Sequence, residues 1–156
     1  MAVVQSFQAA IRGQAKVLVL GSMPGIASLN ADQYYAHPRN AFWPIMASYF
    51  NFNVQLPYTN RLSLLQQKGV GLWDVMAQCE RNGSLDSAIS SASIEVNPLA
   101  ELLAAQANIE CVLLNGGKAY QQFAKHFKGL LNQQGLVVSQ MPSTSPVQLI
   151  ELTKLK

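Results

Sequence analysis

Residues 16–45 read KVLVLGSMPGIASLNADQYYAHPRNAFWPI, in which a short apolar run meets a glycine–proline turn and then a cluster of polar and aromatic side chains. Lys16–Leu20 alternates too little for a half-exposed strand, so its Val and Leu content predicts a parallel strand buried on both faces and ended by Gly21. In open α/β sheets, ligands bind just beyond the carboxyl ends of such strands. We therefore expect a site rim here, formed by Ser22, Met23, Pro24, Gly25, Tyr34, Tyr35, His37, Arg39, Asn40, Phe42 and Trp43.

The rest of the chain alternates helical with strand patterns and carries a Ser-rich loop with one helical turn at residues 84–93. We expect Asn97 to cap a helix that has Pro98 in its first position and an apolar stripe reaching Ala107. Strands that alternate with helices predict a three-layer α/β/α domain with a central, mainly parallel four-stranded sheet. The expected helices cover residues 42–50, 57–67, 98–107 and 118–127, and the expected strands cover 16–20, 70–75, 109–114 and 136–139.

Length and composition indicate one ordinary globular domain. A chain of 156 residues can bury about 70% of its unfolded surface, so residues 1–156 need no second domain. Hydrophobic residues make up 49% and charged residues 12%, which excludes the disordered and fibrous classes. Cys79 and Cys111 are too few and too far apart for a disulfide framework or a zinc site, so we expect two free thiols, with Cys111 in a core strand.

The charge balance gives only weak support for a nucleic-acid partner. The net charge of +3, from 11 basic and 8 acidic residues, permits an anionic partner, but a nucleic-acid footprint is a clustered basic stripe and this sequence has no run of Lys and Arg. The N-terminus lacks a secretory pattern, and no stretch approaches about 18 apolar residues. We therefore expect a cytoplasmic protein with no membrane partner.

Several motifs, most of them at expected strand ends, resemble one known family. Residues 21–25, GSMPG, are similar to the first motif of the uracil-DNA glycosylase superfamily, and residues 141–146, MPSTSP, are similar to its second motif. Residues 35–43, YAHPRNAFW, resemble the stretch shared with mismatch-specific uracil/thymine DNA glycosylases. Residues 71–75, GLWDV, and 115–117, NGG, also fit, so the resemblance covers nearly the whole chain and extends to the hypoxanthine (deoxyinosine) DNA glycosylase branch.

The resemblance implies a monofunctional DNA glycosylase with a single uracil-DNA glycosylase-like domain. Such an enzyme flips a deaminated base, preferably hypoxanthine, out of double-stranded DNA and hydrolyses the N-glycosidic bond, which leaves an abasic site. No nucleophilic Lys, metal or organic cofactor is implied, and we expect a monomer. Two departures stand out: Met23 replaces the Asn that positions water in the mismatch-specific branch, and residues 147–150, VQLI, replace the usual Ala-Asn and longer helix.

Asn40 and His37 are the candidate catalytic residues. Because Met23 cannot orient water, Asn40 is the best remaining side chain for that task, although an Asn here could equally cap the helix beginning at Phe42. The resemblance to the hypoxanthine branch implies that catalysis relies on this later Asn. His37 could donate a hydrogen bond to the leaving base, or it could be a structural hydrogen-bonding residue.

Base binding is expected from three places on the rim. The first-motif backbone could approach a base closely, or it could form a tight turn without a ligand. Tyr35 could stack on the flipped base or pack in the core. Asn115 could contact the base edge or simply end a strand. The first-motif residues concerned are Gly21, Ser22, Met23, Pro24 and Gly25.

Phosphate contacts are expected from Arg39 and from the hydroxyls and amides of Ser143, Thr144 and Ser145. Such contacts position a duplex without reading its sequence. The alternatives are a plain solvated charge for Arg39 and a simple polar turn for residues 143–145. Because right-handed crossovers can bring strand-end loops to one rim, this turn and the first motif can share a site.

Three other functions remain open. A uracil glycosylase acting on G:U mismatches would use the same residues. A serine hydrolase would use Ser22 as nucleophile with His37 or His126 as base, but Gly-x-Ser-x-Gly is missing. A non-catalytic nucleotide- or phosphate-binding module would use residues 143–145 as its anion loop, and it would leave inosine-containing DNA uncut.

Overall fold

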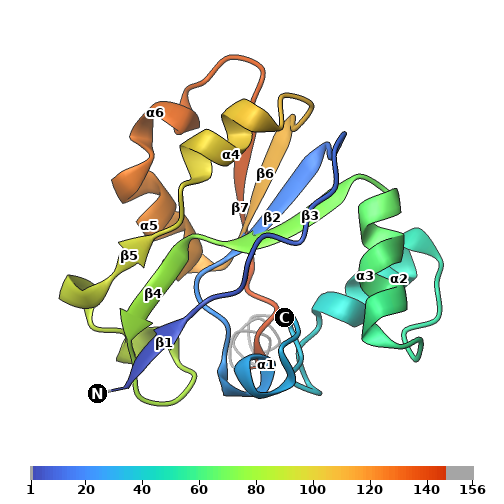
Figure 1. The fold of residues 1–156 in the computed structure, drawn as a ribbon, viewed down its shortest axis with the longest axis horizontal. Helices are drawn as coiled ribbons and strands as arrows, with labels where there is room; N and C mark the ends of the chain where they lie inside the picture. The colour runs from blue at the N-terminus through green and yellow to red at the C-terminus, as the bar shows by residue number, and fades with distance from the viewer. Residues whose placement is uncertain (1, 147–156) are drawn as a thin grey trace, which may run out of the picture.

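The larger sheet of the protein contains four parallel strands, seen in a computed structural model that describes residues 2–146 (Figure 1). These strands are β2 (Val17–Gly21), β3 (Val70–Asp74), β6 (Cys111–Asn115) and β7 (Val137–Met141). Their order is β3-β2-β6-β7, and every neighbouring pair is parallel. The prediction of a mainly parallel four-stranded sheet is therefore confirmed.

The strand register brings the carboxyl ends of this sheet to one edge. Gly21 pairs with Asp74, and Asn115 pairs with Met141. Because all four strands run in the same direction, the loops that follow them leave the sheet on the same side. The GSMPG and MPSTSP segments therefore begin at a common rim, as the sequence predicted.

Helices cover both faces of the large sheet (Figure 1). One face packs against α2 (Phe42–Phe50) and α3 (Tyr58–Gln67) in a core that includes Trp43 and Leu65. The other face packs against α4 (Leu99–Ala105), α5 (Gly117–His126) and α6 (Lys128–Leu131). The three-layer prediction is thus confirmed. Among the helices of residues 2–146, none has the length and apolar character needed to cross a membrane.

A second, antiparallel sheet was not predicted. It contains β1 (Val3–Gln5), β4 (Met76–Glu80) and β5 (Glu95–Val96), in the order β1-β4-β5. Strands of three and two residues with Gln and Glu among them carry no readable hydrophobic period. The Ser-rich stretch between β4 and β5 forms two short 3₁₀ turns rather than one, at Asp86–Ala88 and Ser91–Ser93. A short helix, α1 (Ile26–Ala31), was also not expected.

The expected cap at Asn97 is wrong. Pro98 occupies the capping position of α4, and the Asn97 side chain makes no bond to the helix. Its Nδ2 instead donates to the carbonyl oxygens of Asp74, at 2.8 Å, and Met76, at 3.2 Å. Asn97 therefore fixes the junction where the chain passes from the large sheet to the small one. The helix also ends before Ala107, which is exposed.

Both cysteines are free thiols, as predicted. Cys79 is buried in β4, whereas Cys111 lies in β6 as expected but is only half-buried. The departure from the family pattern at residues 147–150 lies outside the described residues.

Candidate active site

Most of the first-motif loop is buried. Gly21, Ser22, Met23 and Pro24 are all buried. The Ser22 hydroxyl donates to the Asp86 carboxylate at 2.7 Å. The Met23 side chain is 6% exposed and lies in an apolar cluster with Met76, Cys79 and Ile89 beside the small sheet. Since this side chain is used for packing, the backbone is the part of Met23 left to contact a ligand.

Two polar groups crowd the space above Gly21. A Cβ atom at this position would lie 2.6 Å from Asp74 Oδ1 and 3.3 Å from the Tyr35 hydroxyl oxygen. Such a contact with the carboxylate is too close for any side chain, so the rim requires glycine here. Asp74 Oδ2 and the Tyr35 hydroxyl are buried, and neither has a hydrogen-bond partner within residues 2–146. Unpartnered buried polar atoms of this kind are rare and need an explanation.

The Asp74 carboxyl titrates near neutrality. Burial raises its pKa to about 7, the like charge of Asp86 acts in the same direction, and the Arg81 guanidinium opposes both. Burial, followed by the charge of Asp74, also raises the pKa of the Tyr35 phenol. A carboxyl with this pKa can accept a hydrogen bond when ionised and donate one when protonated. Asp74 is the residue that sequence reasoning missed, although its place at the end of an apolar strand on the same rim was the available signal.

The Tyr35 ring is covered by Phe42 on one face, and Tyr35 lines a cavity. Its ring stacks on Phe42, with centroids 4.1 Å apart and an interplanar angle of 20°. Its backbone has φ +57°, a left-handed conformation that bulky residues rarely adopt. Such conformations cluster at functional sites, where the surrounding structure holds them. Because Phe42 occupies one face of the ring, a base can stack only on the other.

The remaining aromatic residues of the rim serve the core. Tyr34 and Trp43 are both buried, and the Trp43 indole donates to the Tyr34 carbonyl at 2.9 Å. The Tyr34 hydroxyl donates to the Gln8 carbonyl at 2.9 Å. The Arg61 guanidinium lies over the Trp43 ring at 4.7 Å from its centroid, a cation–π contact. These residues shape the rim without offering a free polar group.

Asn40 holds the start of α2. Its Oδ1 accepts a hydrogen bond from the Phe42 amide at 2.9 Å, but Ala41 and not Asn40 occupies the capping position of this helix. This bond uses one lone pair of the carbonyl oxygen, and the second lone pair and the Nδ2 hydrogens remain for a ligand. Asn40 is half-buried, not enclosed in packed protein. The bond to the Phe42 amide and a catalytic role can therefore coexist.

The hydrogen bond to His37 fixes which of its nitrogens can donate. Nδ1 accepts from the Arg39 amide at 3.1 Å. In the neutral imidazole the hydrogen must then be on Nε2, which makes Nε2 the donor. His37 and Asn40 line a cavity of about 250 Å³ together with Tyr35, Trp43 and Arg61. The structure therefore brings Asn40, His37 and Tyr35 together, whereas the first motif and residues 143–145 do not line this cavity.

The second-motif loop is attached to both Asn115 and the α2 entry. Asn115 Nδ2 donates to the Thr144 hydroxyl, and the Thr144 amide donates to Asn115 Oδ1, both at 3.0 Å. The Ala41 amide donates to the Thr144 carbonyl at 3.0 Å. The loop after β7 therefore lies directly beside the residue that follows Asn40. These bonds leave one Nδ2 hydrogen of Asn115 and the Thr144 hydroxyl hydrogen unused, so the base contact of Asn115 and the phosphate contact of Thr144 stay predictions.

Within the same loop, the hydroxyls of Ser143 and Ser145 remain the better candidates for phosphate. The Ser145 amide donates to Ser143 Oγ at 3.2 Å. A Cβ atom at Gly116, where φ is +101°, would lie 3.0 Å from the Ser143 Cβ. Arg39 is exposed, as a phosphate contact requires, and it directly precedes Asn40 in the chain.

The serine-hydrolase alternative is not supported by the described residues. Ser22 donates to Asp86, and no His among residues 2–146 accepts its hydrogen, so the serine-hydrolase arrangement is missing. No group of three His, Cys, Asp or Glu residues able to hold a metal occurs in this part of the chain.

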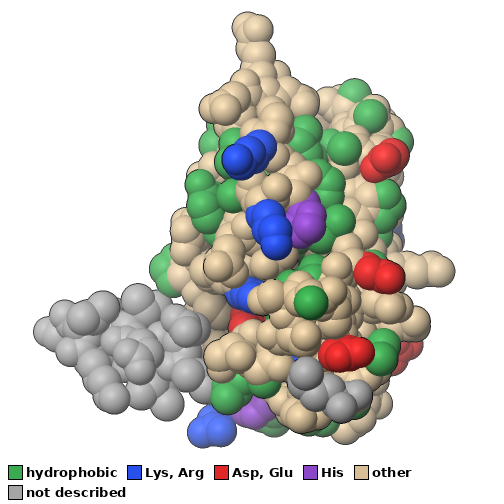
Figure 2. Space-filling view, turned by 90° about the vertical axis from the view of Figure 1, so that its left-hand side faces the viewer, with side chains coloured by type: hydrophobic (Ala, Val, Ile, Leu, Met, Phe, Trp, Pro, Cys, Tyr) green, Lys and Arg blue, Asp and Glu red, His purple; other side chains and the backbone are tan. Residues whose placement is uncertain are grey.

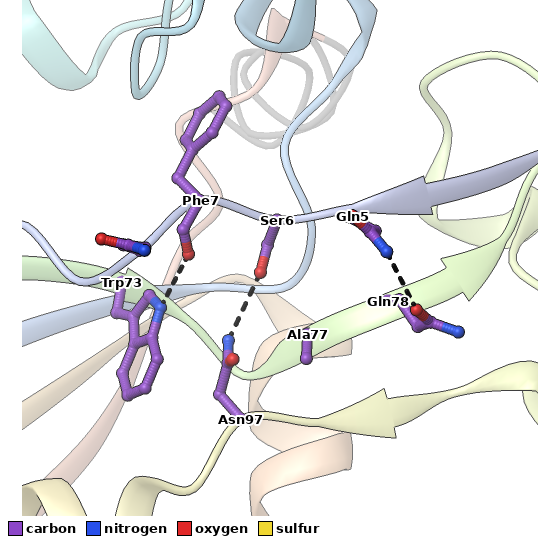
Figure 3. A pocket seen from close by; sticks show the side chains of 8 residues that line it. Gln5, Ser6, Phe7, Trp73, Ala77, Gln78 and Asn97 are labelled. Carbon is purple, nitrogen blue, oxygen red and sulfur yellow. Dashed lines mark hydrogen bonds between the residues drawn. The ribbon is translucent and has the colours of Figure 1, made fainter.

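Another cavity lies away from Asn40 and His37. It has a volume of about 290 Å³ and is lined by Gln5, Ser6, Phe7, Trp73 and Asn97, among others (Figure 3). Its side chains bond to one another, Gln5 to Gln78 and Asn97 to Ser6. We interpret it as a groove between residues 5–8 and the junction of β3 with β4.

Comparison with known proteins finds one family that covers nearly the whole chain. The family model of the uracil DNA glycosylase superfamily matches residues 9–154. A protein of Methanosarcina barkeri named hypoxanthine DNA glycosylase is 37% identical over 116 residues, which cover 74% of this chain and 72% of that protein. A protein of the same name from Methanosarcina acetivorans is 31% identical over 142 residues, covering 90% and 85%.

A solved structure shows the same fold. The solution NMR structure of a candidate uracil DNA glycosylase from Methanosarcina acetivorans matches with a TM-score of 0.79 and 28% sequence identity. The match covers 94% of this chain and 87% of that one.

Proposed function

We propose that this chain, which belongs to the uracil DNA glycosylase superfamily, removes hypoxanthine from double-stranded DNA. It is a DNA glycosylase, and the two relatives named above carry the hypoxanthine assignment. One observation in the structure supports the base assignment most directly: the unpartnered Asp74 carboxyl and Tyr35 hydroxyl above Gly21. The proposed reaction hydrolyses one N-glycosidic bond and leaves an abasic site.

Flipping the nucleotide is the first step of the proposed reaction. Extrusion costs a few kcal/mol, and least for a mispaired base, which favours deaminated bases from the outset. The face of the Tyr35 ring opposite Phe42 would then cover the extruded base, and such stacking contributes about 1 to 3 kcal/mol. Stacking alone tolerates any base, so the selection of hypoxanthine requires polar contacts.

Asp74 is the proposed reader of the base edge. Hypoxanthine presents an N–H donor beside a carbonyl acceptor on its six-membered ring. An ionised carboxylate would accept from the N–H, and a protonated carboxyl would donate to the carbonyl oxygen. Since the pKa of Asp74 is about 7, both forms are populated at neutral pH. The Tyr35 hydroxyl would supply the second contact.

Asn40 is the proposed water-holding residue. Its bond to the Phe42 amide fixes the side chain before substrate arrives, and a fixed polar group costs little reorganisation during the reaction. The remaining acceptor and donor sites of the amide would hold water next to the sugar carbon. As the glycosidic bond breaks, the sugar becomes cationic and the base leaves with negative charge or as a protonated purine. The first-motif amides and His37 Nε2–H would stabilise that leaving base.

The proposed DNA contacts are Arg39 and the hydroxyls of Ser143 and Ser145, which would position phosphates on either side of the flipped nucleotide. On the face drawn in Figure 2, the Lys and Arg side chains are separated from one another and form no continuous patch. This distribution fits an enzyme that makes a few local phosphate contacts. We further propose that it acts as a monomer without metal or organic cofactor.

The test is a strand-cleavage assay on a duplex with one deoxyinosine. After incubation, alkali cuts the DNA at abasic sites, and cleavage by the wild type with loss of at least about a hundredfold in Asn40→Ala would support the proposal. Asn40→Asp keeps the acceptor for the Phe42 amide but removes the Nδ2 donor, so it separates the bond to Phe42 from catalysis. Asn53→Ala is the matched control, because Asn53 Oδ1 accepts from the Gln55 amide at 2.9 Å in the same type of turn.

Substrate comparison tests the base assignment. Duplexes carrying hypoxanthine, uracil, xanthine or thymine lesions should be cut fastest at hypoxanthine. Faster removal of uracil from G:U pairs would transfer the assignment to uracil. Binding without any strand scission would replace the glycosylase by a nucleotide-binding module.

A further inference from the structure

The connection between β4 and β5 holds the first-motif loop from outside the parallel sheet. Three side chains of residues 81–86, which we name the 81–86 clamp, make hydrogen bonds to residues 22–26. Arg81 Nη2 donates to the Pro24 carbonyl at 2.6 Å. The Ser84 hydroxyl oxygen accepts from the Ile26 amide at 2.7 Å. Asp86 accepts from the Ser22 hydroxyl.

Close packing accompanies these bonds. A Cβ atom at Gly25 would lie 3.3 Å from Ser84 Oγ and 3.4 Å from its Cβ. The clamp therefore lies directly against the turn of the first motif. Gly25 leaves the room that lets Ser84 reach the Ile26 amide.

Arg81 is the central residue of the clamp. It is 1% exposed, and its Nε donates to the Gly83 carbonyl at 2.8 Å. Its Nη1 is buried without a partner in the described part of the chain. Burial lowers the pKa of Arg81, and the nearby Cys79, Asp86 and Asp74 raise it. A buried cation costs considerable desolvation energy, so a plain packing role explains this residue poorly.

The bond to Pro24 orients a donor on the other side of the loop. The Pro24 carbonyl and the Gly25 N–H belong to one planar peptide unit, in which the two groups point in opposite directions. No cis peptide interrupts residues 2–146. By holding the carbonyl, Arg81 fixes the direction of the Gly25 N–H, and polarisation along the peptide strengthens that donor. The Gly25 N–H has no acceptor among the described residues.

We propose that Arg81 is a positioning residue for base excision, acting through the Pro24–Gly25 peptide. The inference rests on the proposed glycosylase function and adds a residue that does not touch the base. The Arg81 charge also lowers the pKa of Asp74, while the Asp86 charge raises it. The Asp74 charge in turn raises the pKa values of Tyr34 and Tyr35. Arg81 thus acts both on the first-motif donor and on the carboxyl proposed to read the base.

The test separates kcat from KM on the deoxyinosine duplex. Arg81→Met should lower kcat at least about tenfold, since misplacement by an ångström can cost on the order of a hundredfold, while KM for the duplex stays within about twofold. Arg81→Lys keeps the charge and should restore part of kcat. Arg12→Met, which removes an exposed Arg that bonds to Ser63, is the control for loss of one positive charge.

The pH profile is the second readout. Because Arg81 lowers the pKa of Asp74, Arg81→Met should shift the Asp74-dependent limb of the kcat profile to higher pH, and Arg81→Lys should shift it less. Loss of thermal stability with kcat and pH profile unchanged for the folded protein would overturn the proposal, because a purely structural Arg has that signature.

Two further variants keep the test usable if Arg81→Met does not fold. Ser84→Ala removes the bond to the Ile26 amide, and Asp86→Asn weakens the bond to Ser22. Each variant should lower kcat while KM changes little. An unchanged kcat in both would overturn the clamp. If the wild type cuts uracil but not inosine, the base assignment fails and the same variants are measured on uracil, so the two failures stay distinct.

Discussion

The two loops of the rim are held in different ways. The first-motif loop, residues 22–26, is largely buried, and the 81–86 clamp holds it through a buried cation and a carboxylate. The second-motif loop, residues 142–145, is half-buried or exposed, and the neutral Asn115 side chain and the Ala41 amide hold it. Charged contacts, one of them from a buried guanidinium, suit a loop that must hold a base in one orientation. Neutral contacts suit a loop that meets the backbone of a duplex.

The comparison predicts separable kinetic effects. Changes around the first loop should act mainly on kcat, because that loop would contact the reacting base. Changes around the second loop should act mainly on KM, because that loop would position DNA. If variants at both loops changed kcat and KM to the same extent, the proposed difference between the two loops would be wrong.

The largest effect is expected from Gly21→Ala. The new Cβ would lie 2.6 Å from Asp74 Oδ1, so the buried carboxylate must move. Overpacking of this kind costs about 1 to 3 kcal/mol of stability, and displacement of Asp74 should reduce kcat at least about a hundredfold. Single-turnover cleavage and thermal denaturation measure the two effects. Gly13→Ala is the control, since nothing lies within 4 Å of its Cβ position.

Asn115→Ala should have the next largest effect. It removes both hydrogen bonds to Thr144 and should raise KM about tenfold as the second-motif loop loosens, at a stability cost of about 1 to 3 kcal/mol. Steady-state kinetics on the deoxyinosine duplex distinguish this result from direct base contact. Direct contact would instead lower kcat and change the ranking of hypoxanthine against uracil. Thr144→Val, which removes only the hydroxyl, should show a smaller version of the KM effect.

A moderate effect on stability is expected from Asp74→Asn. The Asp74 pKa rises from 3.8 to about 7 on folding, so between these values the unfolded chain has released a proton that the folded protein keeps. This contribution to stability is present at low pH and is lost as pH rises from about 4 to about 7. Asn has no such titration. The Tm of Asp74→Asn relative to wild type should therefore increase between pH 5 and pH 8 by several degrees, on the scale of about 2 to 4 °C per kcal/mol.

The control for this pH dependence is Glu95→Gln, which removes an exposed carboxylate in β5. Its Tm profile should run parallel to that of the wild type. If the Tm profile of Asp74→Asn also ran parallel to that of the wild type, this would contradict the raised pKa of Asp74.

The smallest effect is expected from Arg39→Ala. Arg39 is exposed, and removal of one phosphate contact should raise KM a few-fold without changing kcat. The slope of log KM against log salt should fall by about 1. Measurement at several salt concentrations checks this, with Arg12→Ala as the variant that leaves the slope unchanged. An unaltered slope for Arg39→Ala would mean that its charge is merely solvated.

Sequence patterns located the large sheet because its strands and helices carry strong hydrophobic periods. The helix at Phe42–Phe50 was predicted with its observed bounds. The strand predicted at residues 16–20 begins and ends one residue before β2. The small sheet has no such period, because β1 and β5 are too short and too polar. Asn97 illustrates a second limit, since an Asn before Pro suits a helix cap as well as it suits bonds to distant carbonyls.

The candidate site was predictable where side chains lie close in sequence. Tyr35, His37 and Asn40 come from one stretch and line one cavity, as the motif suggested. Asp74 and Arg81 were not assigned, because sequence alone does not show that a carboxyl and a guanidinium are buried beside the first-motif loop. The mutual bonding of Asn115 and Thr144 was also hidden, since the two residues meet only when β6 and β7 pair.

The strand order also determines when the chain can fold. Val17 at the start of β2 pairs with Val70 on one side and Cys111 on the other, so the central strand is synthesised first and acquires its neighbours late. Contacts between such distant segments slow folding, and an unpaired apolar strand invites association with other chains meanwhile. A nascent chain of this protein must therefore keep its most hydrophobic strand protected until residues beyond 110 have left the ribosome.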